Sequence, residues 1–154
     1  MKRKTHLSVA AGVVALLAGL LHARFADFGV ALVAALAADE LIDTLGHVGR
    51  RRAPWTHNIL ACLLLPALIT VLLNAPTGWR LATPLAYPLA AAGTLTHLAL
   101  DALTPTGVWP LWPLSSRRLR GPIHYDNPVA NAILAALGAT AFIVGVSLLA
   151  WHAS

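Results

Sequence analysis

The stretch PVANAILAALGATAFIVGVSLLAW, residues 128–151, has no charged side chain along its 24 residues. An α-helix rises about 1.5 Å per residue, and the hydrocarbon core of a bilayer is about 30 Å thick. A run of this length and composition can cross a membrane as a single helix. It therefore predicts a membrane protein.

Four further apolar segments precede it, at roughly 7–23, 26–45, 57–74 and 83–103. Hydrophobic residues make up 58% of the chain and charged residues only 11%, against about 25% charged residues in soluble domains. So little charge could not cover the surface of a soluble fold with hydrophilic groups. The sequence predicts an all-α, polytopic membrane helix bundle of about five helices, forming one domain over residues 1–154.

The first apolar segment has a second interpretation. Met1-Lys2-Arg3-Lys4 followed by an apolar stretch is also typical of a signal peptide. The nearest cleavage point, Leu21-His22-Ala23, has a bulky leucine where a small residue is required. We therefore expect a retained first helix.

The basic residues predict how the bundle is oriented. The net charge is +5 and the pI about 10.4, but the charge lies in short clusters between apolar runs, which argues against nucleic-acid binding and is typical of membrane-flanking loops. Five spans place nine basic residues on one side, leaving only Arg24 and Arg80 on the other. These nine are Lys2, Arg3, Lys4, Arg50, Arg51, Arg52, Arg117, Arg118 and Arg120. By the positive-inside rule the N-terminus is cytoplasmic and the protein lies in the cytoplasmic (inner) membrane.

The acidic and histidine residues converge on that same side. Most of the six acids and seven histidines adjoin the predicted cytoplasmic helix ends: His6, Asp39, Glu40, Asp43, His47, His57, His97, Asp101, His124 and Asp126. Only His22, Asp27 and His152 fall at the other end. Since lysine and arginine alone define the topology, this convergence is partly independent evidence for a polar site at the cytoplasmic end.

Spacing makes the prediction more specific. Asp39 and Asp43 are four residues apart, as are His97 and Asp101, so each pair lies on one face of a helix. Such a pair lets one helix offer two ligands to one metal ion. Carboxylates and imidazoles together suit zinc, manganese or iron.

Simpler interpretations exist for several of these residues. Charged groups near helix ends can lie in the headgroup region, which applies to Glu40, His47, His124 and Asp126. Asp39, His97 and Asp101 could form a structural ion pair. Thr56 could cap the helix that starts near 57. The arginine clusters could simply determine topology, or could contact lipid headgroups or a phosphate.

Three stretches together carry a family resemblance: Thr5-His6, the acidic run Asp39-Glu40-Leu41-Ile42-Asp43, and His97-Leu98-Ala99-Leu100-Asp101-Ala102-Leu103-Thr104-Pro105-Thr106-Gly107 with Leu111-Trp112-Pro113 after it. With Trp55-Thr56-His57-Asn58 between them, the chain resembles the LexA-regulated, inner-membrane-associated family of metal-dependent hydrolases. That family is distantly similar to zinc-dependent phospholipase C and P1 nuclease. The acidic run here lacks the family's usual proline and has a wider spacing.

The resemblance implies a helical membrane protein with a metal site made by His6, Asp39, His57, His97 and Asp101. The expected cofactor is a divalent ion, zinc first and manganese or iron next. We predict a hydrolase acting on a phosphoester such as a phospholipid, with Asp39, Asp43 and His57 as catalytic candidates and Arg51, Arg52 and Arg118 as candidates for binding substrate phosphate. The expected partners are the lipid bilayer and a phospholipid substrate.

Two alternatives stay open at this stage. The same cluster could hold a structural or transported metal ion in a protein that is not an enzyme. It could also bind no metal and serve only to fix helix packing.

Overall fold

The computed structural model describes residues 1–48 and 51–154, and within them it forms five α-helices. These are α1 (Arg3–Leu20), α2 (Phe25–Gly46), α3 (Ile59–Asn74), α4 (Ala86–Ala102) and α5 (Pro128–Ala153). Two-residue strands β1 (His47–Val48) and β2 (Arg51–Arg52) pair antiparallel after α2, and a 3-10 turn η1 (Ala75–Thr77) follows α3. The predicted all-α fold is confirmed.

Helix boundaries differ from the predicted segments by a few residues. The first helix begins at Arg3, four residues earlier than the apolar run, since backbone N–H groups of Thr5 and His6 already bond to Lys2 O. The third begins at Ile59 because the Asn58 side chain accepts a hydrogen bond of 2.8 Å from Ala61 N. Asn58, and not Thr56, is therefore the N-cap of α3.

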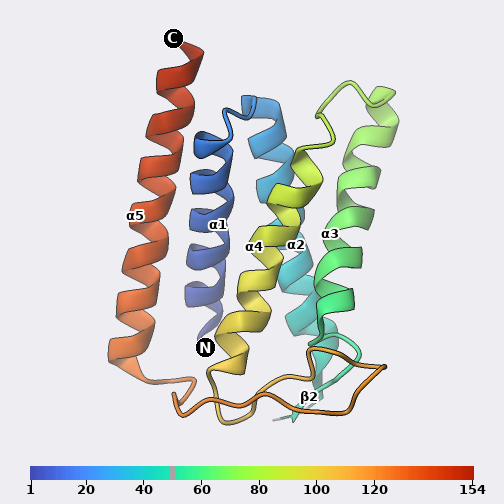
Figure 1. Cartoon of the computed structure of the whole chain (residues 1–154), viewed down its shortest axis with the longest axis vertical. Helices are drawn as coiled ribbons and strands as arrows, with labels where there is room; N and C mark the ends of the chain where they lie inside the picture. Colours follow the sequence, from blue (N-terminus) through green and yellow to red (C-terminus); the bar gives the residue numbers. More distant parts are fainter. Residues whose placement is uncertain (49–50) are drawn as a thin grey trace.

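The helices run roughly along one direction, with α1 to α4 grouped together and α5 lying along the outside of α1 (Figure 1). The N-terminus, the α2–α3 connection and the α4–α5 connection lie at one end of the bundle, here called the site end (Figure 1). The C-terminus and the α1–α2 and α3–α4 connections lie at the other end (Figure 1). The three basic clusters are therefore on the same end of the bundle, except that Arg50 lies outside the described residues.

Glycine lets α5 approach α1 backbone to backbone. Gly12 of α1 faces Gly138 of α5, and Gly19 faces Gly145. On each helix the two glycines are seven residues apart. A Cβ atom added at Gly12 would lie 2.3 Å from Gly138 O, and one at Gly145 would lie 2.2 Å from Ala15 C. Small residues at such positions are typical of membrane helix interfaces. This contact holds α5 to the bundle.

The outer surface of the helices is apolar in the way a lipid environment requires. Two helical stretches, Ile59–Thr77 and Pro128–Ala153, are long and apolar enough to cross a membrane. Exposed aromatic residues lie in the elements of both ends: Trp55 and Tyr125 are in the α2–α3 and α4–α5 connections, and Trp79 and Trp151 are in the α3–α4 connection and the last turn of α5. Tryptophan and tyrosine favour the two membrane–water interfaces. These rings therefore mark two levels that bracket the apolar length of the bundle.

An apolar core fills the middle of the bundle. Val14, Ala31, Ala35, Leu89 and Ala90 are buried together there. A smaller apolar group of Ile42, Cys62, Leu98 and Val108 packs closer to the site end. The buried histidines and most of the buried charged side chains lie at the site end, whereas Asp27 is buried at the other end.

Candidate metal centre

Two helices and one turn bring four side chains together at the site end. Asp43 comes from the last turn of α2, and His97 and Asp101 come from the C-terminal part of α4. His57 lies in the turn that leads into α3. His57, His97 and Asp101 are fully buried, whereas the Asp43 side chain is 25% exposed. The cluster therefore has one side that opens toward the surface.

Four atoms of this cluster form a compact N2O2 group. His97 Nε2 lies 3.3 Å from Asp43 Oδ1 and 3.6 Å from Asp101 Oδ2. His57 Nε2 lies 3.9 Å from the same Asp43 oxygen and 3.6 Å from the same Asp101 oxygen. All four side chains offer ligand atoms within 4.8 Å of one another.

These separations fit a divalent ion better than direct hydrogen bonds. A charge-assisted hydrogen bond between an imidazole and a carboxylate brings the heavy atoms to about 2.7–2.9 Å. Tetrahedral zinc, with nitrogen and oxygen ligands at about 2.0–2.1 Å, separates neighbouring ligand atoms by roughly 3.3–3.4 Å. The four nitrogen–oxygen distances of 3.3–3.9 Å are close to that spacing. The residues present therefore fit a bound metal ion.

The other nitrogen of His57 is held by its neighbour Thr56. Thr56 Oγ1 lies 2.8 Å from His57 Nδ1 and donates to Ala53 O over 3.2 Å. A hydroxyl has one hydrogen, so a threonine that donates to Ala53 accepts from His57 Nδ1–H. This arrangement leaves the Nε2 lone pair directed at the two carboxylates. A ligand histidine in proteins is normally oriented through its second nitrogen in this way.

Gly46 leaves room for this turn at the end of α2. A Cβ atom at Gly46 would lie 2.1 Å from Thr56 Oγ1 and 2.6 Å from the His57 ring. Gly46 looks like the start of a linker in the sequence. The structure shows that its missing side chain permits the position of His57.

The second oxygen of Asp101, Oδ1, is held by three nitrogen donors. Arg52 Nη2 lies 2.6 Å from Asp101 Oδ1, and His6 Nε2 lies 3.1 Å from the same oxygen. The backbone amino group of Met1 lies 3.3 Å from it. Arg52 is itself fixed by a 2.8 Å bond to Thr104 Oγ1. One oxygen of Asp101 is thus oriented by its surroundings, and the other, Oδ2, faces the two histidines.

Asp39 and His6 flank His97 on its remaining sides. His97 Nδ1 faces Asp39 Oδ1 at 3.8 Å, and the His6 ring stacks on the His97 ring with centroids 4.2 Å apart. Both Asp39 oxygens are buried without a hydrogen-bond partner among the described residues. A buried carboxylate without such bonds is costly unless a cationic group is nearby. Asp39 and His6 thus contact His97 at its Nδ1 atom and its ring face, and not at Nε2, the atom that faces Asp43 and Asp101.

The three candidate arginines have different positions. Arg52 is buried on Asp101, as described above. Arg118 stacks on Trp109, with its guanidinium carbon 4.3 Å from the ring centroid, and donates to Thr106 O. Burial lowers the pKa of the Arg118 guanidinium, and the positive charges of Arg120 and Arg52 lower it further. The side chain of Arg51 lies outside the described part of the chain.

Replacing Thr56 by valine is expected to weaken metal binding about 10–100-fold, because the Nδ1 anchor of His57 is lost while the side chain keeps its shape. Thr56→Ser, which retains the hydroxyl, should bind metal as the wild type does. Competition titration of purified protein with a zinc indicator would measure both affinities. Thr44→Val, at an exposed position of α2, is the matched control. Equal affinities in all four proteins would show that Thr56 does not orient a ligand.

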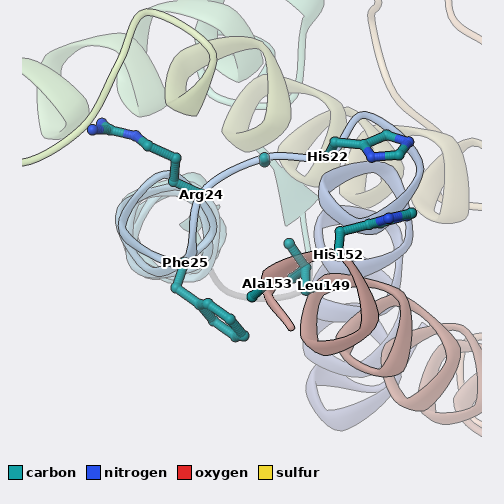
Figure 2. Close-up of a pocket in the computed structure, with 7 residues that line it drawn as sticks. His22, Arg24, Phe25, Leu149, His152 and Ala153 are labelled. Carbon is teal, nitrogen blue, oxygen red and sulfur yellow. The ribbon is translucent and has the colours of Figure 1, made fainter.

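The opposite end of the bundle carries a separate histidine pair. His22 in the α1–α2 turn and His152 in the last turn of α5 bring their rings to 3.6 Å between centroids (Figure 2). They line a cavity of about 350 Å³ with Arg24, Phe25 and Leu149, and His152 and Leu149 project from the same helix (Figure 2). Arg24 is paired with the buried Asp27. None of these residues contributes to the cluster at the site end, in agreement with the predicted topology.

Comparison with known proteins gives one match. A family model described as YdjM inner membrane protein matches residues 1–153. No curated protein matches the chain, and no solved structure matches it either. The match covers nearly the whole chain and supports an inner-membrane location. The chain therefore belongs to the YdjM inner membrane protein family.

Proposed function

We propose that this protein is a membrane-embedded, metal-dependent hydrolase whose site faces the cytoplasm and acts on a phosphoester such as a phospholipid. The observation that carries the proposal is the N2O2 group, in which two imidazole nitrogens and two carboxylate oxygens are spaced as ligands of one ion. The resemblance to metal-dependent hydrolases points the same way. It further implies control by LexA, which stays a prediction.

The ligands in this proposal are Asp43, His57, His97 and Asp101, with zinc first and manganese or iron next. A bound divalent ion would polarise a phosphoryl oxygen and make water more acidic. His6 and Arg52 orient Asp101, and Thr56 orients His57. Asp39 supports His97 from behind, so its role in this proposal is positioning rather than contact with substrate.

Asp43 is the group placed to handle protons. It is the most exposed of the four ligands, so water and substrate reach the cluster on its side. Its carboxylate can accept the proton of an attacking water while the buried members hold the geometry. The positively charged Arg118 lies in the neighbouring connection and can interact with substrate phosphate.

The basic clusters at the site end support a cytoplasmic orientation, with the five helices crossing the membrane as one unit of residues 1–154. The exposed Trp55 and Tyr125 suggest that the site end lies near the headgroup level. A phospholipid would then reach Asp43 laterally from the membrane. This route fits a substrate whose phosphoester lies at the interface.

A structural metal at the same cluster is the second candidate, since four buried or half-buried ligands would also hold an ion permanently. Transport is disfavoured by the packing. The interior between the cluster and the other end contains apolar residues such as Val14, Ala35 and Leu89. An ion crossing the bundle would need polar groups along that path.

A turnover assay separates these functions. Zinc-loaded protein in vesicles of phosphatidylethanolamine and phosphatidylglycerol is expected to release headgroup products, detected by phosphorus NMR. Asp43→Asn and His57→Ala should reduce this release by at least about 100-fold, because each removes a ligand and Asp43→Asn also removes the base. His152→Ala at the other end is the matched control and should not alter it. Metal-loaded wild type that releases no product would contradict the hydrolase and favour a structural ion.

A further inference from the structure

The connection between α4 and α5, residues 103–127, is an ordered part of the site end. It passes beneath the helices (Figure 1). Val108 and Leu119 pair in both directions through backbone bonds of 2.9 Å. Trp109 N donates to His57 O over 3.2 Å, and Ile59 N donates to Pro110 O over 3.0 Å. The hairpin-like segment 109–118 is therefore fixed directly against the turn that carries His57.

This segment presents apolar side chains outward. Leu114 is 93% exposed and Leu111 is 54% exposed, and Trp112 is partly exposed between them. Single exposed leucines are ordinary on protein surfaces. Three large apolar side chains within four residues form a small apolar tip, and a headgroup region beside acyl chains is an environment that suits it.

The end of the same segment carries positive charge that no nearby carboxylate of the described residues neutralises. Among the described arginines of the site end, Arg3 pairs with Glu40 and Arg52 pairs with Asp101, whereas Arg118 and Arg120 have no carboxylate partner. Arg118 Nε is buried without a hydrogen-bond partner, although Nη2 donates to Thr106 O. Burial and the charges of Arg120 and Arg52 lower the pKa of Arg118. This positive charge would be stabilised by an anion.

We propose that residues 109–120 form a binding site for the headgroup phosphate of an anionic phospholipid, with Arg118 and Arg120 at the phosphate and Leu111 and Leu114 beside the acyl chains. The combination of basic and apolar groups on one fixed segment selects a lipid over a soluble anion. Because Trp109 and Pro110 are bonded to the His57–Ile59 turn, the bound lipid lies next to the metal cluster. The lipid-binding site does not depend on the proposed hydrolase function. The further claim that the bound lipid supplies the substrate does rest on that function.

Lipid retention tests the binding site. Protein from nanodiscs of phosphatidylcholine with phosphatidylglycerol is transferred to mild detergent, and bound lipids are counted by native mass spectrometry. The wild type is expected to retain phosphatidylglycerol preferentially. The pair Arg118→Gln with Arg120→Gln should lower this preference about tenfold or more, since each arginine near a membrane surface contributes several-fold to anionic lipid binding. Arg80→Gln, an exposed arginine at the other end, is the matched control.

Two further arms identify the ligand and the membrane contact. Excess inorganic phosphate should not displace the lipid, because it lacks acyl chains. A nitroxide attached at Leu114→Cys should be accessible to oxygen and shielded from a water-soluble nickel reagent. The native Cys62 is buried and should not be labelled. Displacement by phosphate, a water-accessible label, or equal lipid retention by wild type and the double variant would each overturn the proposal.

Metal content separates this result from the proposed function. The Arg118→Gln, Arg120→Gln protein should keep its metal, because neither side chain belongs to the four ligands. Loss of lipid preference with metal retained supports the lipid site. Wild type that retains phosphatidylglycerol but hydrolyses no lipid would contradict the hydrolase and leave the lipid site supported.

Discussion

Protein in which His97 and Asp101 are both replaced by alanine is expected to contain no stoichiometric metal after exposure to zinc, manganese or iron. His97 Nε2 and Asp101 Oδ2 supply one nitrogen and one oxygen of the N2O2 group, and both residues are fully buried. Removing them leaves only His57 and Asp43, which cannot enclose an ion. Elemental analysis of detergent-purified protein would measure the loss against the wild type.

The double substitution also leaves buried charges without their partners. Loss of His97 leaves Asp39 without its histidine, and loss of Asp101 leaves the buried Arg52 without its carboxylate. An unpaired buried charge costs about 3–5 kcal/mol. Asp101→Asn is a second variant, because it keeps the shape of the side chain. His22→Ala at the other end of the bundle is the control and should keep its metal. Metal content that is unchanged in a folded double variant would exclude this cluster as the metal site.

The second large effect is expected at the contact between α1 and α5. Valine in place of Gly138 should destabilise the protein severely in detergent, because its Cβ would lie 2.5 Å from Ser8 O and 2.6 Å from Ser8 C. Backbone atoms on the facing helix cannot move aside as a flexible side chain does, so α5 must separate from α1. Overpacking in a core usually costs about 1–3 kcal/mol, and a backbone clash is at the upper end or beyond. Thermal unfolding in detergent would measure the change.

Gly29→Val is the matched control for this substitution. Gly29 lies in α2, and a Cβ atom there meets nothing within 4 Å. Valine also has a higher helix propensity than glycine, so the control should be neutral or slightly stabilising. Equal melting temperatures for the two variants would show that α5 does not pack on α1 through these glycines.

Much of the fold follows from hydropathy and charge alone. The five apolar segments coincide with the five helices to within a few residues, since long apolar runs leave a membrane chain little alternative to helices. The five-span topology predicted from the sequence also brings the three basic clusters to one end of the bundle. The i, i+4 spacing of Asp39 with Asp43 and of His97 with Asp101 then predicts which side chains share a helix face.

The details of the site depend on contacts that hydropathy cannot reveal. Asp43 was predicted as a catalytic candidate beside Asp39, and the structure brings Asp43 to the ligand atoms of His57 and His97 while Asp39 lies behind His97. The pairing of Arg52 with Asp101 depends on how a short hairpin returns to α4. Thr56 contacts His57 Nδ1, and Gly46 leaves space for the turn that carries both residues. Non-local loop geometry of this kind is fixed by packing rather than by periodicity.

The positions of polar groups along the helices have a clearer sequence signal. His6 follows three basic residues, yet α1 begins at Arg3 and carries His6 into the interior. The stacking of His6 on His97 could be anticipated only once α1 and α4 were known to be neighbours. The sequence thus indicates which end of the bundle holds the chemistry, and the structure shows which atoms meet there.

X-ray absorption at the metal edge, on wild-type protein reconstituted with one equivalent of zinc, would detect the proposed metal centre directly. We expect stoichiometric zinc in a shell of nitrogen and oxygen ligands at about 2.0–2.2 Å, with the multiple-scattering signature of two imidazoles. Two imidazoles and two carboxylates are the ligands that the cluster offers. Zinc that stays fully hydrated, or a shell without histidine, would contradict a metal centre at Asp43, His57, His97 and Asp101.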